Sequence, residues 1–291
     1  MKQLIDLWED STARTEKLLD DLWTGYSEEP QALVFEAMRY SLLAGGKRLR
    51  PMMVRAFCTA AGGSPEMADH AALAIEMIHT YSLIHDDLPA MDNDDYRRGR
   101  LTNHKVYGDA MAILAGDGLL TDAFRVLSMA PIGADRIAAC IQCLSLCAGP
   151  YGMVGGQVLD MEAEHRACTE QEVLDIQSRK TGGLFRASCE MGVICAGGTD
   201  AQREAARIYA DAIGLAFQIR DDILDVTGDA KKLGKAVGVD ENKNTFVKLY
   251  GLKRSEEIVE EQTRIGIHAV ECFDNYDILK NLALFLVHRD H

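Results

Sequence analysis

The amino-acid sequence predicts an all-α fold, and three observations support this prediction. The chain has only six prolines among its 291 residues, and it is rich in Ala, Leu, Met and Glu, which favour helices. Apolar residues recur at three- and four-residue spacing, as at Leu73, Met77, Ile78, Tyr81 and Ile84, which is the period of an amphipathic helix. No segment alternates convincingly between apolar and polar residues over six positions, so no strand of that length is expected.

This spacing predicts a series of long helices along the chain. They lie near residues 3–23, 31–44, 48–61, 65–88, 107–129, 134–154, 170–196, 200–227, 255–271 and 275–287. The polar segment 228–245 is rich in Gly, Lys and Asp, and we expect it to be a long loop of the kind that usually carries function.

Capping residues, prolines and glycines indicate where the helices begin and end. Ser64-Pro65-Glu66 is typical of a helix start with proline at the first helical position, and Pro131 indicates another start. Thr169-x-x-Glu172 has the form of a capping box. Gly62-Gly63 and Gly197-Gly198 are typical helix stops.

Composition and charge exclude several classes of protein. Apolar residues make up 47% of the chain, enough for a large buried core, and the length allows one large domain or two ordinary ones. The net charge of −14 argues against a nucleic-acid binder held by a basic field and against a polybasic membrane-surface protein. Anionic substrates are not excluded, because bound metal ions can invert the local charge.

The chain shows no targeting signal and no expected membrane span. Residues 1–21 are amphipathic and acidic, without a basic stretch followed by an apolar one, so no secretory signal is expected. No window of 18 uncharged apolar residues occurs, so no transmembrane helix is expected. The eight cysteines are scattered, which indicates reduced thiols and a cytoplasmic location.

The first chemical motif is a run of aspartates at a predicted helix end. Five aspartates fall within residues 86–95, and Arg97 and Arg98 follow them. The preceding helix is apolar and Pro89 ends it, so the first carboxylates oppose the dipole at its C-terminal end. Such a run indicates either a bound cation or a fully solvated acidic loop.

The second acidic motif lies within a predicted helix, at residues 218–225. Asp221 and Asp225 are four residues apart and share one helix face. Their neighbours include Leu215, Phe217 and Ile223, which favours partial burial. A buried carboxylate pair needs a cation, and carboxylates with water and phosphate oxygens are the ligands of Mg²⁺. The alternative is a purely structural pair.

The third motif is basic. Gly45-Gly46-Lys47-Arg48-Leu49-Arg50-Pro51 places three cations between a glycine turn and a proline. It indicates an anion cradle, in which Arg makes forked contacts with phosphate, or else a solvated turn. It is not a P-loop, because the spaced first glycine and the Ser/Thr after Lys are missing. Further clusters occur at 180–183 and at Gly234-Lys235. Together these patterns suit two diphosphates, one held by Arg and Lys and one through bridging metals.

Three other patterns are better explained without a site of their own. Cys140-x-x-Cys143-x-x-x-Cys147 has the spacing of a buried helix face. Residues 92–95 resemble the start of an EF-hand, but the glycine and the final glutamate of that loop are missing. His79 with His85-Asp86 could form a phosphohydrolase metal set, but that hypothesis leaves the second acidic motif unexplained.

Four of these motifs, taken in order, resemble those of the trans-prenyltransferases, or isoprenyl diphosphate synthases. They are residues 45–51, 86–99, 180–182 and 217–225, and the likeness extends to 286–289. The insertion Pro89-Ala90 in the first acidic motif is similar to that of bacterial farnesyl diphosphate synthases and plant-type geranylgeranyl diphosphate synthases. The resemblance implies one all-α domain over residues 1–291, with ten or more helices around a deep central cavity (the isoprenoid synthase fold). It also implies a homodimer.

The resemblance also implies a reaction. Dimethylallyl and then geranyl diphosphate would condense with isopentenyl diphosphate, giving farnesyl diphosphate and diphosphate. About three Mg²⁺ ions would assist, with Mn²⁺ as a substitute. Alternatives are a geranylgeranyl or geranyl diphosphate synthase, and more remotely a class I terpene cyclase or a non-catalytic subunit. Nucleic acid and stable membrane insertion are not expected.

Residue roles follow from the resemblance, position by position. The implied metal ligands are acidic residues of the two motifs: Asp86, Asp87, Asp92, Asp221, Asp222 and Asp225. The implied contacts of isopentenyl diphosphate are Lys47, Arg50, His79 and Arg98. The implied contacts of the allylic diphosphate and its reacting carbons are Arg97, Lys180, Thr181, Gln218 and Lys235. Of these, Lys180, Thr181 and Gln218 are the implied catalytic residues. Tyr81 and Ser82, five and four residues before Asp86, would set the product length.

Overall fold

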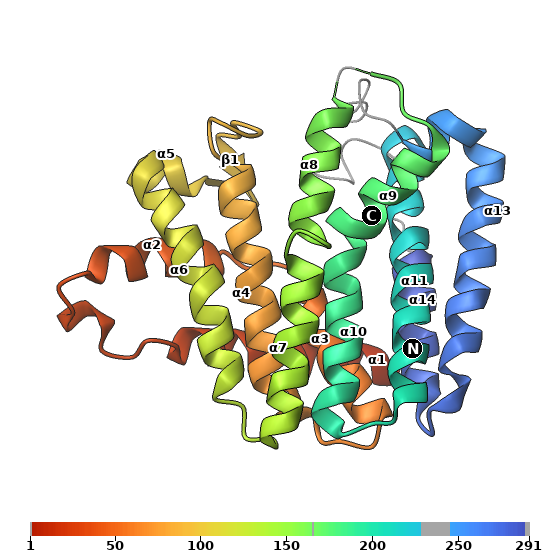
Figure 1. Cartoon of the computed structure of the whole chain (residues 1–291), viewed down its shortest axis with the longest axis horizontal. Helices are drawn as coiled ribbons and strands as arrows, with labels where there is room; N and C mark the ends of the chain where they lie inside the picture. The colour runs from red at the N-terminus through yellow and green to blue at the C-terminus, as the bar shows by residue number, and fades with distance from the viewer. Residues whose placement is uncertain (1, 165, 228–244, 289–291) are drawn as a thin grey trace.

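The helix-favouring sequence folds into a bundle of α-helices in the computed structural model (Figure 1). The structure describes residues 2–164, 166–227 and 245–288. The helices are α1 (Lys2–Asp21), α2 (Ala32–Leu42), α3 (Leu49–Ala60), α4 (Asp69–Asp86), α5 (Asn103–Tyr107), α6 (Asp109–Ser128), α7 (Ala134–Ala148), α8 (Met153–Ala163), α9 (Glu170–Lys180), α10 (Gly182–Ala196), α11 (Asp200–Thr227), α13 (Phe246–Ala269) and α14 (Tyr276–Val287). Short 3₁₀ turns span Tyr26–Glu28, Pro65–Ala68 and Val270–Cys272. The all-α prediction is confirmed.

Several predicted boundaries are confirmed by the local geometry. Thr169 accepts a hydrogen bond from the Glu172 backbone, and the Glu172 carboxylate accepts one from the Thr169 backbone, so the capping box is complete. Gly197 ends α10 in the left-handed conformation, with φ 76°, which glycine adopts without steric cost.

Other predicted helices are divided. The segment 134–154 is broken between Ala148 and Met153, and 170–196 is broken at Thr181. The helix expected near 107–129 begins at Asp109, because Gly108 has φ 84° and separates it from α5. Such breaks leave the apolar period on either side almost in phase, so the sequence pattern alone conceals them.

The remaining boundary predictions need small corrections. The first turn of the segment 65–88 is 3₁₀ and Ser64 makes no side-chain cap, while the helix expected at Pro131 begins at Ala134. The helix expected at 255–271 begins much earlier, at Phe246, and contains a kink at Gly251 with φ 75°. Residues 228–244 of the predicted loop lie outside the described residues.

A short hairpin that the sequence pattern did not predict follows the first acidic motif. Strands β1 (Tyr96–Arg97) and β2 (Arg100–Leu101) pair antiparallel, with Arg97 opposite Arg100. The turn residues Arg98 and Gly99 have φ 54° and 73°, the left-handed conformation that two-residue hairpin turns require. Strands of two residues are too short to show a period of two.

The core is centred on α4 and α10, whose residues are mostly buried. Glycine permits the close approach of α10 to α3, because a Cβ atom at Gly192 of α10 would lie 2.7 Å from Cβ of Phe57 on α3. In Figure 1 the C-terminal end of α4, beside β1, and the C-terminal end of α11 lie at the same end of the bundle. The two acidic motifs end these two helices, so the fold places them at the same end.

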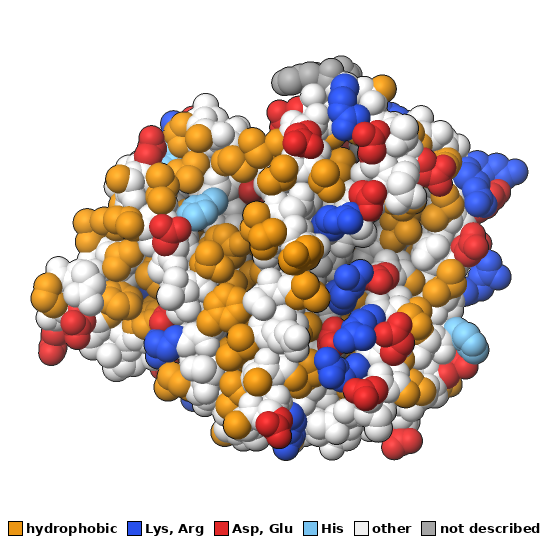
Figure 2. Space-filling view, viewed as in Figure 1, with side chains coloured by type: hydrophobic (Ala, Val, Ile, Leu, Met, Phe, Trp, Pro, Cys, Tyr) orange, Lys and Arg blue, Asp and Glu red, His pale blue; other side chains and the backbone are white. Residues whose placement is uncertain are grey.

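Within the part of the chain that the structure describes, one segment meets the length and composition of a membrane span. It covers residues 134–163, with a mean hydropathy of 1.5 and 39% of its window buried. The segment is two helices, α7 and α8, and α7 packs Cys140, Leu144 and Cys147 into the core. The cysteine triplet is therefore part of a buried helix face, as its spacing predicted. Figure 2 shows hydrophobic side chains gathered over α6, α7 and α8.

We expect Gly192→Ala to lower the free energy of unfolding by about 1–3 kcal/mol, because the new methyl group overpacks the contact of α10 with α3. Thermal unfolding followed by circular dichroism measures the change. Gly214→Ala is the matched control, since its Cβ would meet Phe185 at an ordinary 3.8 Å. Equal melting temperatures for the two variants would contradict this account of the α10–α3 contact.

Candidate active site

The glycine turn of the basic motif receives the hairpin arginine. Gly45 and Gly46 have φ 77° and 134°. A Cβ atom at Gly46 would lie 2.8 Å from Cζ of Arg98, and the Arg98 guanidinium donates a hydrogen bond to the carbonyl of Gly45. This contact joins the loop before α3 to the hairpin after α4, so two of the sequence motifs form one surface.

The neighbouring cations of the basic motif have different roles. Arg48 is buried, and its guanidinium donates to Glu16 at 2.7 Å, to Glu76 at 2.6 Å and to the Leu42 carbonyl at 2.7 Å. Each of the three guanidinium nitrogens of Arg48 therefore has a partner within the protein, so its role is structural. Lys47 is exposed.

Arg50, His79 and Arg98 form a cationic cluster. The Nε of Arg50 is buried and has no hydrogen-bond partner among the described residues. Burial lowers the pKa of Arg50 to about 10; the charge of Glu76 opposes this shift, and the charge of Arg98 adds to it. Burial, with the charges of Arg50 and Arg98, lowers the pKa of His79 well below its usual range, so its imidazole is neutral. A buried donor without an acceptor, among like charges, is suited to an anionic ligand.

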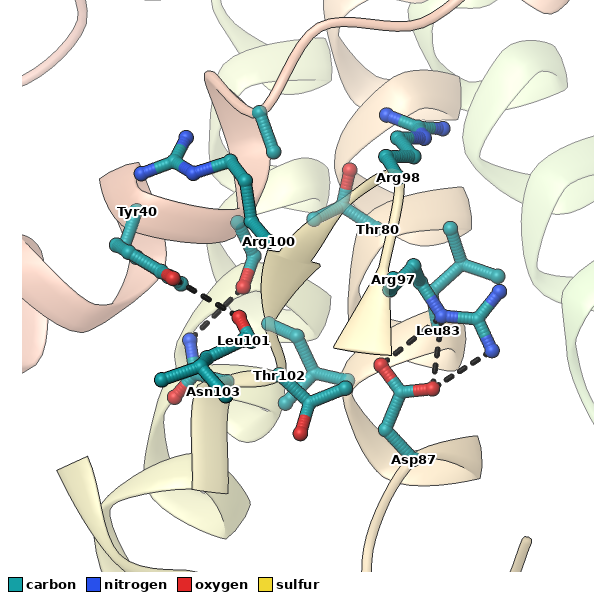
Figure 3. A pocket seen from close by; sticks show the side chains of 13 residues that line it. Tyr40, Thr80, Leu83, Asp87, Arg97, Arg98, Arg100, Leu101, Thr102 and Asn103 are labelled. Atoms are coloured by element: carbon teal, nitrogen blue, oxygen red, sulfur yellow. Dashed lines mark hydrogen bonds and ion pairs between the residues drawn. The ribbon is translucent and has the colours of Figure 1, made fainter. Parts of the chain in front are cut away.

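Arg97 points away from this cluster, toward the first acidic motif. Figure 3 shows its guanidinium against the Asp87 carboxylate, at 2.6 to 2.9 Å. Asp87 is buried, and burial raises its pKa although Arg97 opposes the shift. Asp87, a predicted metal ligand, and Arg97, a predicted contact of the allylic diphosphate, therefore neutralise each other in this conformation.

The first acidic motif closes into a tight loop at the end of α4. The backbone N–H of Asp92 donates to the Asp86 carbonyl at 2.8 Å. Burial raises the pKa of Asp86 to about 6, and the nearby charge of Lys180 opposes the shift. Lys180 itself pairs with Asp160 of α8 at 2.5 Å. The carboxylates of Asp86 and Asp160 and the ammonium group of Lys180 therefore lie near one another, although they come from α4, α8 and α9.

The second acidic motif adjoins the cationic cluster through two aromatic rings. The guanidinium of Arg50 lies 5.8 Å from the Phe185 ring centroid, and Phe185 lies 5.4 Å from Phe217. Gln218 and Asp221 follow Phe217 on α11. Asp222 accepts a hydrogen bond of 2.8 Å from the Phe246 backbone at the start of α13, so it also holds two helices together.

The other predicted residues are placed as follows. Asp225, Thr181 and Gln218 are half-buried, and Asp221 and Asp92 are exposed. Tyr81 is buried in the core, and the Ser82 hydroxyl donates to the His79 carbonyl at 2.9 Å. Lys235 lies outside the described residues.

The carboxylates fit a metal that takes part of its ligands from a substrate. Among residues 2–164, 166–227 and 245–288, no three His, Cys, Asp or Glu side chains converge in a closed metal site. Mg²⁺ is usually held by one or two carboxylates with water and phosphate oxygens. A half-buried carboxylate with a raised pKa, such as Asp86, would be stabilised by such an ion.

Two residues of this site were not singled out in the sequence. Asp160 holds Lys180, and Glu76 holds Arg48. The signal for Asp160 was available, because Gly155-Gly156-Gln157-x-x-Asp160 puts a carboxylate one turn after a glycine pair in an apolar helix. Gly156 is required because a Cβ atom there would lie 2.6 Å from Cα of Lys180.

The fold and the site are those of an α-helical protein that pairs a cationic cluster with acidic motifs at one end of its bundle. A family model described as polyprenyl synthetase matches residues 31–272, and the chain belongs to this family. The sequence is 46% identical over 263 residues to a farnesyl diphosphate synthase of Micrococcus luteus, covering 89% of this chain and 90% of that protein.

Other relatives carry different product names. A chloroplastic geranylgeranyl pyrophosphate synthase of Capsicum annuum is 46% identical over 271 residues, covering 91% of this chain and 73% of that protein. A solved structure of an FPP/GFPP synthase from Zymomonas mobilis matches with a TM-score of 0.87 at 36% identity, covering 98% of this chain and 99% of that chain. The predicted fold and family resemblance are confirmed.

We expect Asp86→Asn to stabilise the metal-free protein above pH 6. The pKa of Asp86 is raised from 3.8 to about 6, so the folded protein binds this proton more tightly than the unfolded chain does. Stability is therefore lost as the pH rises from about 4 to 6, by up to about 3 kcal/mol. The amide removes this loss, which raises the melting temperature at pH 8 in chelator.

The same comparison at pH 4 serves as the internal control, because there the carboxyl of the wild type is largely protonated and the two proteins should melt alike. The exposed Asp21, replaced by Asn, controls for the loss of one negative charge. An Asp86→Asn variant that melts below the wild type at pH 8 would contradict the desolvation of Asp86.

Proposed function

We propose that the protein is a prenyltransferase, active as one unit over residues 1–291, that makes farnesyl diphosphate. It would condense dimethylallyl and then geranyl diphosphate with isopentenyl diphosphate, releasing diphosphate. The observation that carries the proposal is the position of Arg50. Its buried, unpartnered Nε lies in a cationic cluster that adjoins the second acidic motif through Phe185 and Phe217.

The cationic cluster is proposed to bind isopentenyl diphosphate without metal. Arg50, His79 and Arg98 would meet the diphosphate, with Lys47 at the exposed rim. The neutral imidazole of His79 can donate one hydrogen bond there. Arginine forks match phosphate oxygens, and each charge-assisted hydrogen bond contributes about 1.5–3 kcal/mol.

The allylic diphosphate is proposed to lie between the two acidic motifs. Arg97, Lys180 and Lys235 would contact its diphosphate, and Thr181 and Gln218 would face the reacting carbons. Arg97 would then leave Asp87 for the substrate, since the guanidinium is bound to that carboxylate at present. Asp160 would keep Lys180 oriented, because their ion pair joins α8 to the end of α9.

Mg²⁺ would be held by Asp86, Asp87, Asp92, Asp221, Asp222 and Asp225, about three ions in all, with Mn²⁺ as a substitute. When bound, these ions act as Lewis acids on the leaving diphosphate. Lys180, held by Asp160, would help to stabilise the charge that develops on the leaving diphosphate. The apolar neighbours of the site exclude water, which would otherwise capture the allylic cation.

Product length is proposed to be set by Tyr81. Five residues of helix rise place it about 7.5 Å below Asp86, and its ring is buried among core side chains. A growing prenyl tail that runs beside α4 would meet the Tyr81 ring and also Ser82, the next residue of the helix. This favours farnesyl diphosphate, with geranylgeranyl and geranyl diphosphate as the alternatives. Arg50 and Arg98 argue against a terpene cyclase, which needs no second diphosphate site.

A homodimer in the cytoplasm is proposed as the working form. Large apolar side chains are exposed on α6, α7 and α8, among them Ile113, Leu114, Leu146, Val154 and Val158. Figure 2 shows hydrophobic side chains gathered over these three helices. Exposed apolar patches of this kind mark protein interfaces. A second copy of the chain would cover them.

The proposed reaction is tested by incubating the protein with isopentenyl diphosphate and each allylic diphosphate in turn. With Mg²⁺ we expect mainly C15 product, identified by chromatography after dephosphorylation, and with excess chelator no product. Tyr81→Ala should shift the product toward C20 while the protein stays active. A wild type that forms no elongated product would exclude the proposal.

The division of the two diphosphate sites is tested by two variants. Arg50→Ala should raise the KM for isopentenyl diphosphate about tenfold or more, with a small effect on the allylic substrate. Arg97→Ala should do the reverse. The two variants control for each other, and equal effects of both on both substrates would show that the division is wrong.

The proposed dimer is tested by sedimentation. Leu146→Glu replaces one of the exposed apolar side chains of α7 by a charge, and we expect it to convert the dimer to a monomer at micromolar concentration. Glu257→Lys, on the exposed surface of α13, is the control for a surface charge change. A wild type that sediments as a monomer would refute the dimer.

A further inference from the structure

The imidazole of His85 lies in a notch on α6 that only glycine provides. A Cβ atom at Gly116 would overlap the ring, whose Cε1 would lie only 2.8 Å from it. The Nε2 atom of His85 lies 3.2 Å from the Ile113 carbonyl oxygen, so the ring donates to α6 when Nε2 carries the proton. Gly116 leaves room for the imidazole, and the Ile113 carbonyl orients it.

The same ring contacts Tyr81, one turn earlier on α4. The two ring centroids are 5.7 Å apart and the planes meet at 77°, the edge-to-face arrangement that aromatic pairs favour. Tyr81 is buried, with 6% of its surface exposed. Interiors are close-packed, so the tyrosine keeps its position only while its neighbours keep theirs.

The backbone beneath His85 has little freedom to move. Asp86 and Asp87 follow directly, and the Asp87 carboxylate is bound by Arg97 of the hairpin. A side chain added on α6 must therefore displace the imidazole, or separate α6 from α4. Either movement removes the support from the Tyr81 ring.

We propose that His85 and Gly116 are positioning residues that determine product length by holding Tyr81. The inference rests on the proposed function, because Tyr81 is its chain-length residue. Gly116 admits the imidazole, the Ile113 carbonyl orients it, and the imidazole keeps the tyrosine ring across the path of the growing tail. Neither residue is among those proposed to bind the diphosphates or the metal ions, so we expect their main effect to be on where elongation stops.

The same helix offers a matched control. Gly118 lies two residues after Gly116, and a Cβ atom there would meet Sδ of Met38 at 2.8 Å. Met38 belongs to α2 and its sulfur is near the end of a flexible side chain. Gly118→Ala therefore changes α6 in the same way as Gly116→Ala without touching His85.

The experiment measures the ratio of C20 to C15 product at matched turnover, with geranyl and isopentenyl diphosphates and Mg²⁺. We expect Gly116→Ala and His85→Ala each to raise this ratio at least fivefold, and Gly118→Ala to leave it within twofold. In the His85→Ala background, adding Gly116→Ala should change the ratio less than twofold, since the ring it displaces is gone. If Gly116→Ala does not fold, His85→Ala tests the same support.

The inference is overturned if Gly116→Ala or His85→Ala keeps the ratio of the wild type while Tyr81→Ala raises it. It is also overturned if Gly116→Ala acts equally with and without His85, because the effect would then arise from α6 itself. A wild type that forms no elongated product overturns the proposed function, and an unshifted Tyr81→Ala overturns the choice of Tyr81; either removes the basis of this inference too.

Discussion

The arrangement of the site depends on one buried guanidinium, that of Arg48. It binds Glu16 of α1, Glu76 of α4 and the last carbonyl of α2, and it begins α3 with a left-handed φ of 45°. Removing one partner of such a buried pair costs about 3–5 kcal/mol. Helices α1, α2, α3 and α4 therefore meet at Arg48, which lies between Lys47 and Arg50 in the sequence.

The protein pairs some of its cations and leaves the Nε of another without a partner. Arg48 and Arg55 are matched by carboxylates, the latter by Asp69 with Ser11 and Thr15. The side chain of Arg50 is half-buried, and its buried Nε has no such match among the described residues. Since an unmatched buried donor is costly, this group supports the proposal that a diphosphate binds to the cationic cluster.

The carboxylates of the site also differ in whether they already have a partner. Asp87 and Asp222 are engaged, one by Arg97 and one by the Phe246 backbone, while Asp86 has its pKa raised by burial. This combination of engaged and destabilised carboxylates supports the proposed metal site, in which an ion would take further ligands from a diphosphate.

Much of the fold and the site could be predicted from local sequence. The helices follow from a 3.6-residue period, the capping box at Thr169 from its own side chains, and the two acidic motifs from carboxylates that local forces disfavour. These are properties of residues near one another in the chain. The family resemblance then placed the motifs in a common site.

Tertiary structure decided what depends on contacts distant in sequence. Arg48 and Arg50 are two residues apart and chemically alike, but Arg48 has ion pairs with Glu16 and Glu76, while the Nε of Arg50 has no partner among the described residues. The hairpin at 96–101 is too short to show a period, and Asp160 matters only because α8 lies against the end of α9. Sequence determined the helices and the chemistry of the motifs, because both are local; the three-dimensional packing decided which charges are already paired, because the partners come from other helices.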